Sequence, residues 1–181
     1  MFRRFAFVVL ATVFIHIGGN AAVSCGPAVE VKFIESAGDI FQITNKSEGP
    51  WALVSLVIRL TGSQGGLVFD TEDGGPGYSM HQAFEPVAGN VGLLGAEPVG
   101  DGAEEMRLLF SDFVAGREFM FIIDVDDRLE SSDYGQAVVS GDEIEGASAE
   151  AVLTMPGGAK ATPKASFGND GVARLRGGTC A

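Results

Sequence analysis

Apolar residues in this chain recur at every second position, in short segments that Gly, Pro, Asp and Ser residues separate. The clearest case is residues 119–125, where Phe119, Phe121, Ile123 and Val125 alternate with other side chains. A period of two places alternate side chains on opposite faces of a strand, so each segment predicts a β-strand with one buried face. No stretch of ten or more residues combines a helical period with caps at both ends. The pattern predicts an all-β protein.

Segments of this kind recur about every dozen residues. The best apolar faces lie at 29–33, 41–43, 54–60, 67–69, 106–110 and 119–125, with weaker candidates at 137–139, 149–154 and 171–175. In the third of these, Val54, Leu56, Ile58 and Leu60 are expected to share one face. Residues 95–105 are rich in Gly and acidic side chains and are expected to form a loop. Eight to ten such strands favour a single antiparallel β-sandwich, with a jelly roll or an open barrel as alternatives.

The first 22 residues have the order of a secretory signal peptide. Arg3 and Arg4 precede an apolar run over residues 5–17, and small residues follow. That run is shorter than the roughly 20 residues that a membrane-spanning helix needs. We therefore expect residues 1–22 to be a signal peptide and residues 23–181 to be one secreted domain without a transmembrane span. The mature protein would then be periplasmic, secreted or on the cell surface.

Acidic residues outnumber basic ones by 24 to 12, which gives a net charge of −12. Cleavage of the signal peptide would remove two Arg residues and no acidic residue, which brings the charge to −14. Nucleic-acid binding needs clustered Lys and Arg side chains that neutralise phosphates, and no such cluster is present. Nucleic acid is therefore excluded as a partner.

The two cysteines are Cys25, at the start of the expected mature chain, and Cys180, next to its last residue. Disulfides form and persist in exported proteins, so a Cys25–Cys180 bridge would tie the two chain ends together. Residues 22–25 also allow a second interpretation, a bacterial lipoprotein signal in which Cys25 is acylated and Cys180 has no partner.

The motifs of common enzyme classes are missing. His81 is the one histidine left after cleavage, and its neighbourhood lacks the Gly-x-Ser-x-Gly turn of serine hydrolases. The chain also has no zinc-binding or nucleotide-binding motif. We expect no catalytic activity, with a hydrolase that uses an unrecognised site as an alternative.

Carboxylates cluster at residues 70–73, 124–127 and 142–145. In the second cluster Asp124 and Asp126 project to one side of a strand end and Asp127 follows at once, while Glu143 and Glu145 repeat this spacing in the third. Calcium (Ca2+) prefers six to eight oxygen ligands, so we expect these five residues to form a calcium site. Two observations oppose it. Asp commonly ends strands and starts turns, and Arg128 could neutralise one carboxylate.

The chain resembles small exported bacterial proteins labelled aggregation factor core, a name borrowed from an extracellular adhesion protein of sponges. The resemblance spans residues 24–147, and the segments that carry it are 24–26, 29–34, 65–70, 121–127 and 140–147. It implies a secreted β-rich domain without established catalysis, whose name suggests calcium-dependent adhesion.

These features together favour an exported, non-catalytic module in cell-surface adhesion or aggregation. Its partner would be an extracellular or cell-surface protein or a glycan. A carbohydrate-binding module is an alternative, although such modules usually present a flat row of aromatic side chains. The expected mature chain offers only Trp51, Tyr78 and Tyr134 besides its Phe residues.

Overall fold

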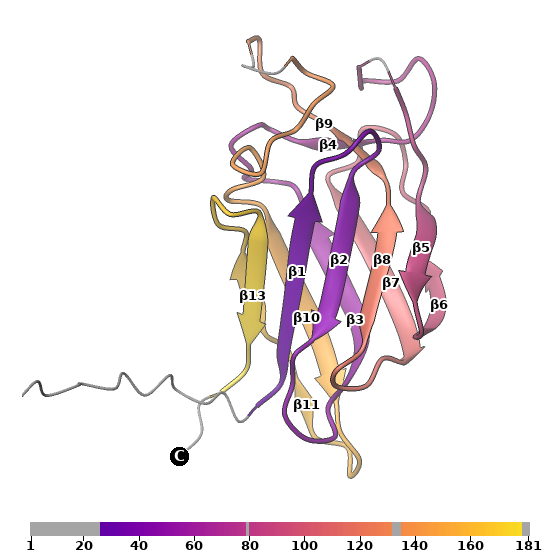
Figure 1. Cartoon of the computed structure of the whole chain (residues 1–181), viewed down its shortest axis with the longest axis vertical. Helices are drawn as coiled ribbons and strands as arrows, with labels where there is room; N and C mark the ends of the chain where they lie inside the picture. Colours follow the sequence, from indigo (N-terminus) through magenta and orange to yellow (C-terminus); the bar gives the residue numbers. More distant parts are fainter. Residues whose placement is uncertain (1–25, 79, 132–134, 179–181) are drawn as a thin grey trace, which may run out of the picture.

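The computed structural model describes residues 26–78, 80–131 and 135–178 (Figure 1). All regular secondary structure in this part of the chain is β-strand, and it contains no helix that could cross a membrane. Antiparallel strands form two sheets that pack face to face, which confirms the predicted β-sandwich. The expected signal peptide, residues 1–22, and both cysteines, Cys25 and Cys180, lie outside the described residues.

The two sheets share the chain almost equally. Sheet A contains, in spatial order, β13 (Val172–Arg176), β1 (Ala28–Ile34), β2 (Ile40–Asn45), β8 (Glu118–Ile122) and β5 (Glu85–Gly89). Sheet B contains β11 (Lys160–Ala161), β10 (Ser148–Thr154), β3 (Ala52–Arg59), β7 (Glu105–Asp112) and β6 (Gly92–Ala96), and β12 (Lys164–Ser166) also pairs with β10. The chain passes between the sheets repeatedly, so the core forms between strands that are distant in sequence.

The core contains the apolar faces that the period of two predicts. Phe119, Phe121, Ile123 and Val125 are buried together with Leu56, Ile58 and Phe33. The ring of Phe121 stacks on that of Phe41 at 5.3 Å between centroids, with 12° between the ring planes. Stacked and edge-on aromatic pairs of this kind add to the stability that apolar burial provides.

Three details of the sequence prediction are wrong. Val54 is only half-buried and Leu53 takes its place in the core, because the pairing of β10 with β3 has a bulge at this point. Residues 137–139 are not a strand. The region predicted as a loop at 95–105 begins inside β6, and the sequence did not reveal β5 or β6 because these edge strands lack a buried alternating face.

The predicted strand at 119–125 is divided in two. It ends as β8 at Ile122 and continues as β9 (Asp124–Asp126), which leaves sheet A and pairs with β4 (Val68–Asp70). The resulting two-stranded ribbon lies across one end of the sandwich, at the top of Figure 1. This ribbon carries the residues described next.

Candidate metal centre

The β4–β9 ribbon brings three carboxylates to one place. Asp70 lies directly opposite Asp124 in the antiparallel register, and Asp126 follows Asp124 by two residues on the same face. The residues between them, Phe69 and Val125, lie on the opposite face and are fully buried in the core. The alternation of the ribbon thus separates an apolar face from an acidic one.

Asp70, Asp124 and Asp126 form what we call the carboxylate triad. Each contributes an oxygen atom, and the three oxygens lie within 4.8 Å of one another. All three side chains are buried, with exposed fractions of 4%, 6% and 0%. Buried carboxylates are costly unless they are paired, protonated or bound to a metal, so such a cluster requires compensation.

Residues 71–78 and 80–82 lie against the triad. The backbone N–H of Tyr78 donates a short hydrogen bond to Oδ2 of Asp126. The backbone N–H of Gln82 donates to the carbonyl of Asp70 at 3.2 Å, and the carbonyl of Gln82 accepts from the N–H of Asp124 at 3.0 Å. Gly77 lies so close to Asp70 that a Cβ atom there would be 2.2 Å from the carboxyl carbon. The segment therefore packs directly against the carboxylates.

Protein groups leave part of the triad unsatisfied. Oδ1 of Asp70 and Oδ1 of Asp126 are both buried and accept no hydrogen bond from an N–H or hydroxyl donor within the described residues, and the same holds for Oδ2 of Asp127 outside the triad. The carboxyl groups of Asp70 and Asp126 lie within hydrogen-bonding reach of each other. Among those residues no Lys, Arg or His forms an ion pair with the triad. Buried polar atoms without a partner are uncommon in native proteins, so these oxygens are available to a ligand.

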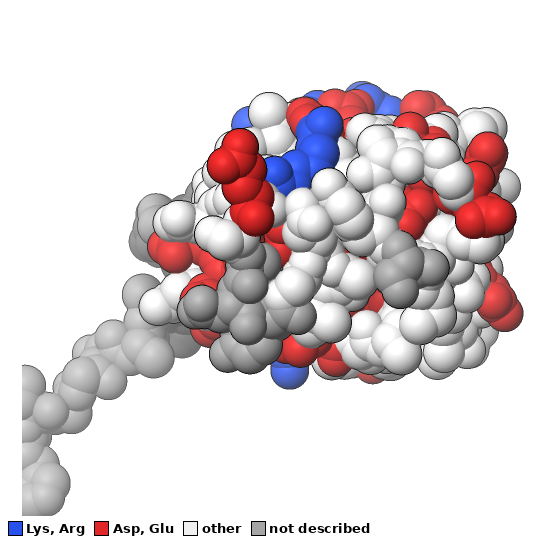
Figure 2. Space-filling view, turned by 90° about the horizontal axis from the view of Figure 1, so that it is seen from above, with Lys and Arg blue, Asp and Glu red and all other residues white. Residues whose placement is uncertain are grey.

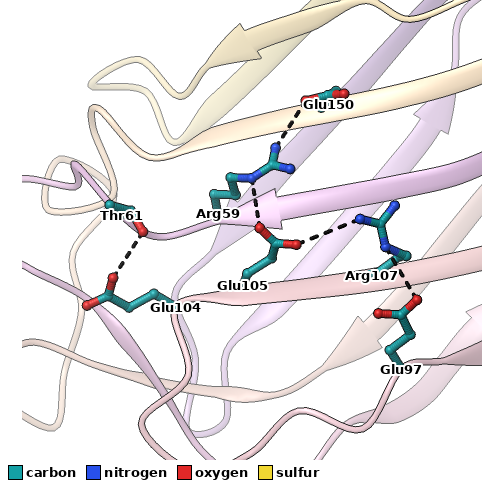
Figure 3. Close-up of polar contacts among 7 residues, drawn as sticks. All are labelled: Arg59, Thr61, Glu97, Glu104, Glu105, Arg107 and Glu150. Carbon is teal, nitrogen blue, oxygen red and sulfur yellow. Dashed lines mark hydrogen bonds and ion pairs between the residues drawn. The ribbon is translucent and has the colours of Figure 1, made fainter.

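Several arginine side chains form ion pairs away from the triad. On the outer face of sheet B, Arg59 binds Glu105 at 2.8 Å and Glu150 at 3.1 Å, and Arg107 continues this row of ion pairs (Figure 3). The guanidinium of Arg128, next to the second acidic cluster in sequence, pairs with Glu104. Figure 2, which looks onto the end of the sandwich that carries the ribbon, shows many more acidic than basic side chains. Arg128 therefore does not neutralise the triad.

Two further carboxylates flank the triad. Asp101 accepts hydrogen bonds from the backbone N–H groups of Thr71, at 2.9 Å, and Glu72, and the Thr71 contact is the main reason that the pKa of Asp101 is lowered. Asp39 lies in the turn between β1 and β2, and its carbonyl accepts from the N–H of Ile123 at 3.0 Å. Burial raises the pKa of Asp39 to about 8.

The pKa values of the triad are raised as well. Burial raises the pKa of Asp126 to about 7, against the hydrogen bond from Tyr78, and the charges of Asp124 and Asp70 raise it further. Burial and the Asp70 charge raise the pKa of Asp124 to about 6, against the opposing effect of His81. Burial, followed by contact with Asp101, raises the pKa of Asp70. The largest cause in each case is burial, which removes the hydration of the charged carboxylate.

The geometry and the donor atoms fit calcium. Calcium binds oxygen at about 2.3–2.6 Å, so two ligands on opposite sides of the ion are up to about 5.2 Å apart. The 4.8 Å limit among the triad oxygens is compatible with that spacing. Zinc prefers His and Cys ligands, and the triad contains neither. Three carboxylates also exceed the charge of a divalent cation by one, so the remaining ligands can be neutral oxygens.

The structure divides the five residues that the sequence suggested. Asp124 and Asp126 are in the triad, whereas Asp127, Glu143 and Glu145 are not. Asp127 lies with Glu143 beside Gly65, and its Oδ1 accepts from the N–H of Leu129 at 2.9 Å. Glu143 accepts from the N–H and hydroxyl of Ser140, at 2.6 and 2.9 Å. A separate cleft of about 350 Å³ is lined by Gln64, Leu129, Asp142, Glu143 and Glu145.

Sequence reasoning did not place Asp70 beside Asp124. Asp70 ends an apolar segment, as Asp124 does, and it belongs to one of the three acidic clusters. The missing information was that these two strand ends pair with each other.

The fold and the site together define a β-sandwich that has a buried carboxylate triad at one end. Comparisons with protein-family models, with curated proteins and with solved structures found no match to this chain.

Proposed function

We propose that the mature chain is an exported, non-catalytic β-sandwich module in cell-surface adhesion or aggregation, and that it binds calcium through Asp70, Asp124 and Asp126. One observation carries the calcium part of this proposal. Three buried carboxylates lie within 4.8 Å of one another, two of their oxygens accept no N–H or hydroxyl hydrogen bond, and no basic side chain among the described residues forms an ion pair with them.

The extracellular role has separate support. The first 22 residues have the order of a signal peptide, and calcium is abundant enough outside cells to fill sites with dissociation constants of about 10⁻⁴ to 10⁻³ M. The resemblance to aggregation factor core proteins favours adhesion. The sequence lacks the motifs of common enzyme classes, which favours a binding role.

Thermal unfolding of the mature protein tests the calcium site. A cation that binds only the folded state stabilises it by RT ln(1 + [L]/Kd). At 10 mM calcium a site in the affinity range above contributes about 1–3 kcal/mol. For a domain of this size that is a rise in Tm of about 3–10 °C, which an excess of chelator should reverse.

Two variants make the test specific. Asp126→Asn removes one triad charge and keeps the shape of the side chain, and it should abolish the rise in Tm. Asp73→Asn removes an exposed charge from the adjacent residues 71–78 and should keep the rise. A wild-type Tm that calcium does not change, or an Asp126→Asn protein that responds like wild type, would contradict the proposal.

A further inference from the structure

A cleft of about 440 Å³ opens beside the triad. Its walls come from the turn between β1 and β2, which contributes Glu35 and Ala37, and from two segments that contribute Met80 and Val138. Asp124 is part of the lining, so the cleft and the triad share a carboxylate. The volume is within the range of about 300–1,000 Å³ that is usual for small-molecule sites.

We propose that this cleft binds a neutral sugar, whose hydroxyl groups complete the coordination of a calcium ion held by the triad. This inference rests on the proposed calcium site and names the class of ligand that the site receives. Calcium takes six to eight oxygens, and three carboxylates leave places that hydroxyl groups can fill.

The cleft walls suit the apolar face of a sugar ring. Met80 and Val138 are 54% and 41% exposed, and Ala37 and Ala137 add two small exposed apolar side chains. C–H groups of a sugar can pack on such a surface while its hydroxyl groups point towards Asp124. A sugar therefore matches both the apolar residues of the lining and its two acidic residues, Glu35 and Asp124.

The charge of the site favours a neutral ligand over an acidic one. Besides the triad, the carboxylate of Glu35 lines the cleft. One divalent cation cannot neutralise this set of carboxylates. An acidic peptide or an anionic sugar would meet a surplus of negative charge, whereas hydroxyl groups would not.

Calorimetric titration of the mature protein tests the inference. The probes are the methyl glycosides of mannose, galactose and fucose, with glucuronic acid and a tetra-aspartate peptide as acidic probes. Each is titrated in 10 mM calcium and again in excess chelator. At least one neutral glycoside should bind in calcium, and its affinity should fall at least tenfold in chelator.

Substitutions in the lining of the cleft test glycoside binding separately from calcium binding. Ala137→Trp fills the cleft from one side and Ala37→Trp fills it from the other. Each should lower glycoside affinity at least tenfold and leave the calcium Kd within about twofold of wild type. Val87→Trp, at an exposed position in edge strand β5, is the matched control and should change neither.

The outcomes are distinct. Calcium binding without any glycoside binding overturns this inference and leaves the proposed function intact. Binding of the acidic probes alone, or equal glycoside binding in chelator, also overturns it. If calcium itself does not bind, the proposed function and this inference both fail.

Discussion

Replacement of Gly77 by Ala should disturb the triad directly. An added Cβ atom would lie 2.2 Å from both Cγ and Oδ2 of Asp70, whereas ordinary contacts begin at 3.4 Å. The Asp70 carboxylate or residues 71–78 must therefore move by more than 1 Å. Gly77 does not have a left-handed backbone, so the effect is one of packing alone. Overpacking of this kind typically lowers the unfolding free energy by about 1–3 kcal/mol.

The same movement should weaken calcium binding, because Asp70 supplies one of the three coordinating carboxylates. A loss of about 1.4 kcal/mol in binding free energy corresponds to a tenfold higher Kd, and we expect a loss at least this large. Urea unfolding in chelator measures the stability effect, and calorimetric titration with calcium measures the affinity.

Gly100→Ala is the matched control for this variant. A Cβ atom at Gly100 would meet nothing within 4 Å, and its backbone is not left-handed. The control also accounts for the stabilisation of about 0.4–1 kcal/mol that Gly→Ala changes produce through the unfolded state. If Gly77→Ala and Gly100→Ala have the same stability and the same calcium affinity, Gly77 does not pack against the Asp70 carboxylate.

Three further predictions concern pH, the core and the chain ends. In chelator, the pKa values of about 7 for Asp126 and about 8 for Asp39 exceed the unfolded value of about 3.9, so the folded state binds more protons between pH 4 and 8. The unfolding free energy measured in urea should therefore fall as the pH rises through this range. Calcium should stabilise the protein more at pH 8 than at pH 5. An unfolding free energy that rises with pH in chelator would refute this. Phe121→Ala should lower the unfolding free energy by about 3–5 kcal/mol because the ring is fully buried. Met120→Ala, on the other face of β8, should lower it by less than about 1 kcal/mol. Equal losses would show that the buried and outer faces of β8 have been exchanged. Mass analysis of the exported protein should show the loss of about 20–24 residues. Non-reducing peptide maps should show a Cys25–Cys180 bridge, since the N–H of Gly177, three positions before Cys180, donates to the carbonyl of Pro27, two positions after Cys25, at 2.9 Å. A lipid on Cys25 would replace the bridge.

The sequence was sufficient for the sandwich because its core strands carry alternating apolar faces. Phe119 and Phe121 show this alternation clearly, and both are buried as predicted. The edge strands β5 and β6 were not predictable in this way, since they are largely exposed and contain Gly and Pro residues. The bulge that moves Leu53 into the core also depends on a partner strand about 100 residues away.

The candidate site was predictable only in part, for a related reason. The spacing of Asp124 and Asp126 places both on one face of a strand, and the structure has them there. Asp70 joins them through pairing between strand ends that are 54 residues apart, which a single sequence does not specify. Asp127 and Glu143 were grouped with them by their order along the chain, whereas the structure places this pair beside Gly65.

Calorimetric titration of calcium into the mature protein tests the central claim most directly. We predict saturable binding of calcium to the wild-type protein with a Kd of about 10⁻⁴ to 10⁻³ M. The double variant Asp70→Asn/Asp126→Asn should lose this binding, and the exposed control Asp73→Asn should keep it. No binding at millimolar calcium, or unchanged binding in the double variant, would contradict the assignment of the carboxylate triad as a calcium site.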